Sequence, residues 1–382
     1  MIFAVSNGLL YVCFALVIGH CILSMLPEDK KPRVVVPKKW QVGSVLLIPM
    51  LSLPPVLHVT LNMNEYREES FISSFIYVLM EIELGRAWTA LLLLVIIFAA
   101  LMWLLPKRRD DSYVNLAGLL LVFGMIVTQG VVGHSANMAS YPGATSHILH
   151  LMAVSTWVGI LMIVSWFAVN DENWEGFVDW FTPIAVICVI VVSFSGVFMT
   201  FFLTENIMNS WMLTYGQALL FKHLLFIPLM VYACINGFLM RRKVKNTPTV
   251  SPRSWWRAES LIIMAVFVIT GFMSEQEPPQ NIAQTLNREG SSILFQSLVT
   301  FPVNSDTELF FHLHWFSLLF FLIGIVFLLL VIYVFYKNDT ITGSIVFGVL
   351  AVISIYFGII SGVEAATYVE ETSVTSLLNS GW

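Results

Sequence analysis

Histidines gather near the ends of several long apolar segments in this 382-residue chain. Six of the eight histidines lie at such ends: His58, His134, His147, His150, His312 and His314. Neutral imidazole is the commonest metal ligand in proteins, and imidazole sites suit copper, zinc, iron or nickel. A histidine also sits comfortably at a membrane boundary without any ligand, because its ring is apolar at one end and polar at the other. We nevertheless expect at least three of the six to share a metal site.

Methionines near the same level narrow the choice of metal. They are Met63, Met138, Met152, Met208 and Met212. Thioethers are soft ligands, so histidines combined with Met138 and Met152 favour Cu(I). His147 and His150 are three residues apart and share one face of a helix. His312 and His314 are two residues apart, so in a helix they diverge, and we expect only one of them to point toward the site.

A second group of polar and soft residues lies deeper in the same segments. Lys222 and His223 lie about two turns inside the apolar segment 214–240. An unpaired charge at that depth is costly, so a functional role is the default hypothesis. The predicted Cu(I) path comprises Lys222, His223, Met199, Met230, Cys188 and Cys234. Cysteine and methionine are also ordinary packing residues in apolar helices, and a lysine can extend its amine toward the boundary. The path is therefore a hypothesis that depends on how the helices pack.

The elements that must position these residues are membrane-spanning helices. Apolar residues make up 58% of the chain and charged residues 11%, and the mean hydropathy is +0.82. Crossing a bilayer takes about 20 apolar residues. Segments of this length fall at 2–26, 41–61, 84–105, 112–133, 146–169, 180–203, 214–240, 257–274, 308–336 and 341–366. We therefore predict an all-α polytopic transmembrane helical bundle of about ten spans, with Pro54 and Pro55 breaking the second span and the stretch 70–85 lying at the interface.

Charge and cysteine usage exclude other classes of protein. The net charge of −5 has no basic field over a whole domain, so nucleic-acid binding has no support. Four cysteines without a CxxC motif give neither a disulfide framework nor a zinc knuckle. The first apolar segment lacks a basic start and a small-residue cleavage site, so we expect it to be a retained helix. No P-loop occurs in the sequence, so we expect any transport to be passive or coupled to a gradient or to reduction.

Lysine and arginine set the orientation, because they favour cytoplasmic loops. They cluster in alternate loops, at 30–39, 107–109 and 241–257. We therefore predict that both termini lie outside, together with the loops 62–83 and 275–307. The loop at 170–179 is predicted to lie inside, although it carries four acidic residues and no basic one. The outer loop 275–307 leads directly into His312 and His314, so we expect it to cap the histidine site.

Several short motifs occur in a characteristic order between the fourth and eighth spans. They are Gly133-His134-Ser135-Ala136, His147, His150, Trp157-Val158-Gly159, Thr214-Tyr215-Gly216, Lys222, Asn236, Arg257-Ala258-Glu259 and Pro278-Pro279. In this order and spacing, about residues 112–280 resemble the copper-resistance protein D (CopD) family of bacterial inner-membrane proteins. The family often shows a glycine pair after the tryptophan, where this chain reads Gly159-Ile160. The resemblance implies a multi-pass protein of the bacterial cytoplasmic membrane that handles copper, with uptake the usual proposal.

The resemblance also suggests a division of the chain and a choice among functions. Residues 1–111 would form N-terminal helices with the outer loop 62–83, residues 112–280 the CopD-like core, and residues 281–382 an outer loop with two C-terminal helices. A copper permease is the favoured function, more a transporter than an enzyme, with the copper ion, the lipid bilayer and an extracytoplasmic copper chaperone as partners. A haem-binding redox enzyme is the first alternative, since histidines such as His150, His134 and His223 can ligate haem axially. A metal-binding sensor or assembly factor is the second.

Overall fold

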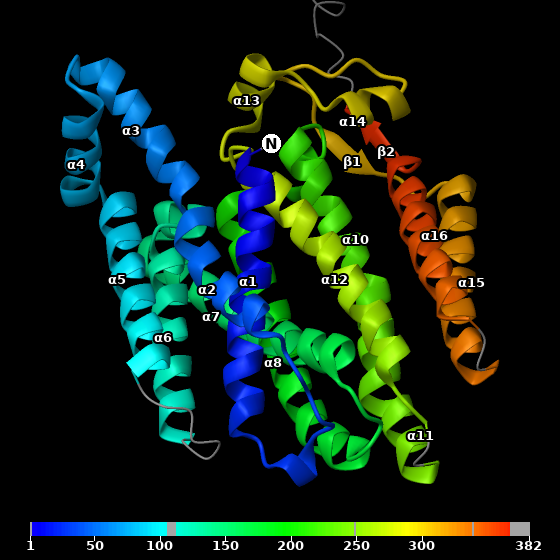
Figure 1. The fold of residues 1–382 in the computed structure, drawn as a ribbon. Coiled ribbons are helices and arrows are strands. Elements are labelled where there is room, and N and C mark those ends of the chain that lie inside the picture. Colours follow the sequence, from blue (N-terminus) through cyan, green and yellow to red (C-terminus); the bar gives the residue numbers. More distant parts are fainter. Residues whose placement is uncertain (1, 105–111, 248–249, 338–339, 367–382) are drawn as a thin grey trace, which may run out of the picture.

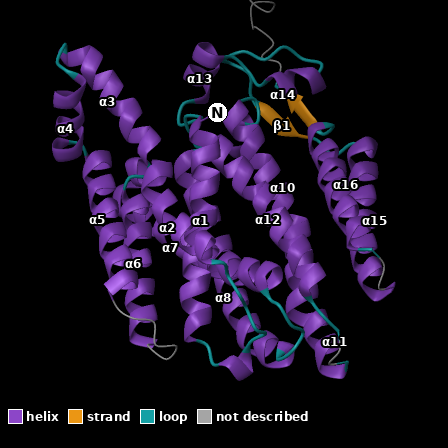
Figure 2. Ribbon diagram, viewed as in Figure 1, coloured by secondary structure: helices purple, strands orange, loops and turns teal. Residues whose placement is uncertain are grey.

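The computed structural model describes residues 2–104, 112–247, 250–337 and 340–366. Ten helical segments in these residues are long and apolar enough to cross a membrane. Figure 1 shows them as a bundle with most helices running roughly from top to bottom of the view. The described residues also form a two-stranded sheet, seen at the top of Figure 2. The predicted all-α polytopic bundle of ten spans is confirmed.

The elements follow one another along the chain with short connections. They are α1 Ile2–Met25, η1 Glu28–Lys30, α2 Lys38–Leu51, α3 Leu53–Arg67, α4 Phe71–Glu81, α5 Glu83–Leu104, α6 Ser112–Val131, α7 His134–Phe167, α8 Trp174–Leu203, α9 Ile207–Ser210, α10 Thr214–Cys234, η2 Ile235–Leu239, α11 Met240–Asn246, α12 Arg253–Met273, α13 Ile282–Glu289, α14 Ile293–Leu298, β1 Leu309–Phe311, α15 Trp315–Lys337, α16 Ile341–Ile360 and β2 Val363–Ala365. The second span is divided at Ser52, just before Pro54 and Pro55, and α4 is a short apolar helix in the stretch predicted to be interfacial.

Several span boundaries differ from the sequence prediction, three of them at predicted site residues or at the strand pair. The ninth span begins at Trp315 rather than at residue 308, because Leu309–Phe311 pairs as β1 with β2. For the same reason the tenth span ends at Ile360 and not at residue 366. The fifth helix starts earlier than predicted, at His134, and kinks at Ala139 and Ser140, whose φ is 48°. His147 and His150 therefore lie inside a helix that has already begun, and His312 and His314 precede theirs.

The loops that are predicted to lie inside contact one another through ion pairs and hydrogen bonds. Asp171 accepts a 2.8 Å hydrogen bond from Arg253, and Asp179 pairs with Arg241 at 2.6 Å and Lys245 at 2.9 Å. Burial acts to raise the pKa of Asp171, but hydrogen bonds from Ser251, Arg253 and Trp174 outweigh it and hold the pKa below its ordinary value. The acidic loop 170–179 and the basic segment after α10 therefore lie on the same side of the bundle (bottom of Figure 1), as the predicted orientation requires. The predicted basic loop 107–109 lies outside the described residues.

Helices α1 and α7 approach each other closely at two glycines. A Cβ atom on Gly159 would lie 2.1 Å from the carbonyl oxygen of Ala15, and one on Gly19 would lie 2.3 Å from the Gly159 backbone. Small residues let membrane helices pack backbone to backbone. The glycine at position 159 is therefore required by packing against α1, and α1 holds the helix that carries His147 and His150.

Replacing Gly159 by alanine should destabilise the bundle. The added methyl group forces α1 and α7 apart, and overpacking of this kind costs about 1–3 kcal/mol. Thermal unfolding of detergent-purified protein should show a lower midpoint for G159A. Gly43→Ala is the matched control, because a Cβ atom there meets nothing within 4 Å. Equal midpoints for the two variants would contradict a backbone contact between α1 and α7.

The C-terminal hairpin of α15 and α16 docks on α10 through buried hydrogen bonds. Tyr232 donates to Ser344 at 2.7 Å, and Tyr356 donates to Gln217 at 2.7 Å. Above them the outer loop forms α13 and α14, and the amide of Ser292 donates to the carbonyl of Met212 at 2.7 Å. Figure 1 shows this loop across the top of the bundle, beside β1 and β2. The hairpin and the outer loop are thus fixed to the core by specific polar contacts.

Candidate functional site

His150 lies between α7 and α8, where Ser195 orients its ring. The His150 Nδ1 atom is 3.0 Å from the Ser195 hydroxyl oxygen, and the ring also contacts Gly196. The Ser195 hydroxyl donates its proton to the carbonyl of Val191 at 2.5 Å. Because that proton is already used, the hydroxyl accepts from Nδ1–H of a neutral imidazole, and the backbone of Val192 is a further hydrogen-bond partner of the ring. This tautomer leaves the lone pair of Nε2 available for a metal, the arrangement found around metal-bound histidines.

Two further groups lie near His150 on its outer and lateral sides. His147 is one turn earlier on α7 and packs against Gly133, where a Cβ atom would lie 2.3 Å from the His147 Nδ1 atom. Lys222 comes from α10, and both His147 and Lys222 lie within electrostatic range of His150. The predicted pairing of His147 with His150 on one face is thus joined by a lysine from a different helix. A cation bound at His150 would experience the charge of Lys222 directly.

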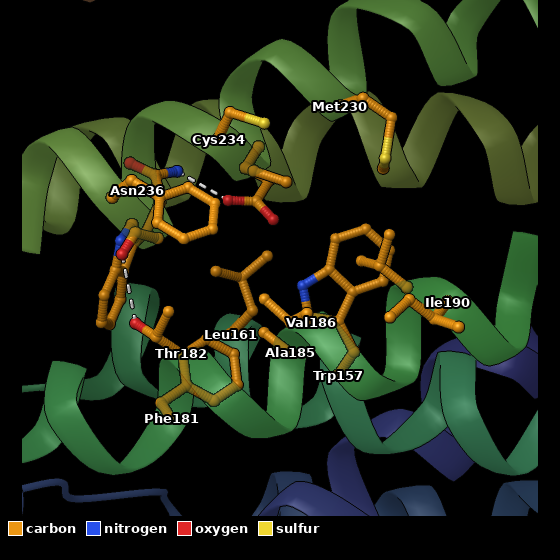
Figure 3. Close-up of a pocket in the computed structure, with 16 residues that line it drawn as sticks. Trp157, Leu161, Phe181, Thr182, Ala185, Val186, Ile190, Met230, Cys234 and Asn236 are labelled. Carbon is orange, nitrogen blue, oxygen red and sulfur yellow. Dashed lines mark hydrogen bonds between the residues drawn. The ribbon is translucent and has the colours of Figure 1, made fainter.

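A cavity of ≈ 210 Å³ lies deeper between the same helices. In Figure 3, Met230, Cys234 and Asn236 lie on one side of this cavity and Trp157 and Leu161 of α7 on the other, with residues of α8 beside them. The cavity is also lined by Glu259 of α12, whose side chain is 2% exposed. A carboxyl group at this depth is expensive to bury, so ionisable residues there are functional candidates.

Glu259 is held by hydrogen bonds from two directions. Asn236 donates to Glu259 Oε2 at 2.6 Å, and the Trp157 side chain is a second hydrogen-bond partner of the carboxyl group. Asn236 lies in η2, a π-helical turn, and such turns are frequent at functional sites. Among the described residues, Asn236 Oδ1 and Trp256 Nε1 have no hydrogen-bond partner. Unsatisfied buried polar atoms beside a cavity indicate that water or a ligand is bound there.

His150 with its neighbours and the cavity with Glu259 form two polar sites, which lie at different depths of the interface between α7, α8 and α10. His150 and Trp157 are seven residues apart on α7, so they share a face and lie about 10 Å apart along the axis. Lys222 and Met230 are eight positions apart on α10, and Met230, which lines the cavity, is the deeper of the two. The space between α7, α8 and α10 therefore presents imidazole nitrogens first and a carboxyl group with sulfur atoms about two turns further in.

The six predicted outer histidines do not form one cluster. His58 is exposed on α3, on the opposite side of the bundle in Figure 1 from β1, which leads into His312 and His314. Met152 packs against a different group of helices, in the hydrophobic cluster of α1, α5 and α6. The side chains of His134 and Met138 lie outside the described part of the structure. The structure instead presents two pairs, His147 with His150 inside the bundle and His312 with His314 at its outer edge.

The predicted inner path is divided in a similar way. Met230 and Cys234 line the cavity, the Cys188 thiol lies within hydrogen-bond distance of the Trp157 backbone, and Met199 is buried on α8. His223, by contrast, is exposed on the surface of α10, next to Lys222. The path residues at the interface of α7, α8 and α10 are therefore Met230, Cys234, Cys188 and Lys222.

Sequence reasoning did not select Glu259, Asn236 or Trp157 as site residues, although all three occur in the motifs quoted above. The predicted eighth span began at residue 257, which placed Glu259 at the membrane boundary. Helix α12 begins at Arg253, so Glu259 lies almost two turns inside it. An acidic residue within the first turns of a predicted span, opposite an asparagine near the end of the preceding one, is the signal that could have identified the pair.

These features define a polytopic α-helical membrane protein with polar residues buried between its spans. Residues 175–273 match the family described as Copper resistance protein D, and residues 1–144 match the Copper resistance protein D-like N-terminal domain. These two matches support the predicted resemblance to the copper-resistance protein D family. The chain is 26% identical over 301 residues to the copper transport protein CutJ of Bacillus subtilis, across 74% of this chain and 55% of that protein. The chain thus spans about half the length of this relative, and no solved structure matches it.

Proposed function

We propose that this protein conducts copper across the bacterial cytoplasmic membrane, in the direction of uptake. The observation that carries the proposal is the line of polar and soft groups between α7, α8 and α10. His147 and His150 receive the ion, and Met230, Cys234 and Glu259 accept it about two turns deeper. The matches to the two copper-resistance models and the name of the relative support copper as the transported ion.

Each step of this path uses the chemistry of its residues. Imidazole nitrogen binds both oxidation states of copper, and the thioether and thiol at the inner cavity favour Cu(I). Lys222 adds a positive charge beside His150. Its repulsion keeps the ion from binding too tightly, and conduction requires a site that also releases its ion.

Glu259 supplies the opposite charge at the inner site. A carboxylate there offsets the charge of a cation in the low-dielectric interior, and a protonated carboxyl group restores neutrality after the ion leaves. Asn236 and Trp157 hold the group in either state. An extracytoplasmic copper chaperone is a candidate donor of the ion at the outer side.

Copper accumulation in vesicles tests the proposal. Purified protein reconstituted into copper-free liposomes should take up Cu(I), supplied with a reductant, faster than protein-free liposomes do. An absorption spectrum of the same sample distinguishes the haem-binding alternative, which requires a Soret band. No uptake above the protein-free control, in either orientation, would reject the permease and leave a metal-binding sensor or assembly factor.

A further inference from the structure

A third group of metal-ligating side chains lies outside both polar sites of the bundle. It consists of His312 and His314, in the link between β1 and α15, and Glu364 of β2. One ligand atom from each residue lies within 4.8 Å of the other two. The group is outside the two segments that match the family, residues 1–144 and 175–273. Its position at the top of Figure 1, beside the outer loop, is on the predicted outer side.

The extended backbone of the link brings the two histidines together. Side chains two residues apart lie on the same side of an extended chain, whereas in a helix they diverge. The rings of His312 and His314 accordingly stack with centroids 4.9 Å apart and an angle of 19° between their planes. The two side chains therefore do not diverge as predicted, because the helix begins only after them, at Trp315.

Backbone contacts fix the link against the end of α16. The amide of His312 donates to the carbonyl of Gly362 at 2.7 Å, and β1 pairs with β2 so that Phe310 lies opposite Glu364. Ser317 and Ser361 form a further contact at 3.1 Å. The carboxyl group of Glu364 reaches His314 Nε2 at 2.7 Å. The strand pairing and these contacts of the link therefore hold the three potential ligands in place.

The distances suit one ion after a small adjustment. Nitrogen and oxygen ligands lie about 2.0–2.2 Å from a transition-metal ion, so neighbouring ligands of a tetrahedral site are roughly 3.4 Å apart. The His314 and Glu364 side chains are 43% and 40% exposed, and His312 is exposed as well. The ion can therefore enter from solvent and keep at least one water ligand.

The ligand set also selects the class of ion. Two imidazoles and one carboxylate contain no sulfur, and this combination suits divalent borderline ions more than Cu(I). Among these ions nitrogen and oxygen sites favour Cu(II) most strongly. We propose that His312, His314 and Glu364 form an extracytoplasmic binding site for a divalent transition-metal cation, with Cu(II) the tightest ligand. The proposal does not depend on transport through the bundle.

Copper titration followed by electron paramagnetic resonance tests this site. The full chain, purified in detergent and carrying His147→Ala/His150→Ala to remove the inner histidines, is titrated with CuCl2. We expect one bound Cu(II) with nitrogen hyperfine structure. Adding His312→Ala/His314→Ala should weaken binding at least tenfold and abolish that signal. Glu364→Gln, which preserves the shape of the side chain, should weaken binding severalfold while both nitrogen ligands remain.

His58→Ala is the matched control, because His58 is exposed on another outer helix and has no place in the group. It should leave affinity and spectrum unchanged. An unaltered affinity and spectrum in the His312→Ala/His314→Ala protein would overturn the proposal, as would equal losses in the His58→Ala control. Since the readout is binding and not uptake, the outcome is separable from that of the vesicle experiment.

Discussion

Glu259→Gln should slow copper uptake into liposomes at least tenfold while leaving the outer histidines able to bind copper. The substitution preserves the size of the side chain and its capacity to accept from Asn236, whose amide lies 2.6 Å from Glu259 Oε2. It removes the negative charge and the exchangeable proton. A tenfold loss corresponds to about 1.4 kcal/mol of barrier, well within the cost of leaving a cation uncompensated in a membrane interior.

The thermal midpoint separates a functional carboxyl group from a structural one. Burying a charged group costs more free energy than burying a neutral polar group of similar volume. We therefore expect Glu259→Gln to unfold at the wild-type temperature or above it. Thr182→Val is the matched control, since Thr182 lines the same cavity and donates only a 3.4 Å hydrogen bond to Gly237. Wild-type uptake by Glu259→Gln would contradict a role for this carboxyl group in transport.

The number and order of the spans could be predicted because hydrophobic length is a local property of the sequence. All ten predicted segments have a counterpart among the candidate spans, including the broken second span at Ser52. The ends were less accurate where tertiary contacts override hydropathy. Leu309–Phe311 is apolar enough to continue a helix, yet it pairs with Val363–Ala365, more than fifty residues later. No local pattern indicates such pairing.

The candidate site could be predicted only in part for the same reason. Helical spacing correctly placed His147 and His150 on one face, because that relation lies within a single helix. Whether histidines of different helices meet depends on packing, and α3 and β1 lie on opposite sides of the bundle. The hydrogen bonds between Asn236 and Glu259 and between His150 and Ser195 likewise join residues of neighbouring helices, 23 and 45 positions apart. The sequence contains these residues but does not show which pairs meet.

His150→Ala should reduce copper uptake by at least tenfold, the largest effect expected at the outer end of the path. The substitution removes the Nε2 lone pair that the contact with Ser195 leaves available, and no other imidazole of α7 lies at that depth. Ser195→Ala should have a smaller effect, because it retains the ligand and removes only the group that orients it. Because removing the partner of a ligating histidine typically costs about 10–100-fold, we expect a loss of about tenfold for Ser195→Ala and a larger loss for His150→Ala.

The comparison of the two variants distinguishes a ligand from a packing residue. If His150 merely fills space between α7 and α8, His150→Ala should lower the thermal midpoint and reduce uptake only in proportion to the folded fraction. If His150 binds copper, uptake per folded molecule falls in His150→Ala. The copper concentration that gives half-maximal uptake then rises in both His150→Ala and Ser195→Ala. His58→Ala, on α3, should match the wild type in both measurements. Normal uptake by folded His150→Ala would contradict a copper site at His150. His312 and His314 would then be the remaining described pair of histidines at which copper could enter.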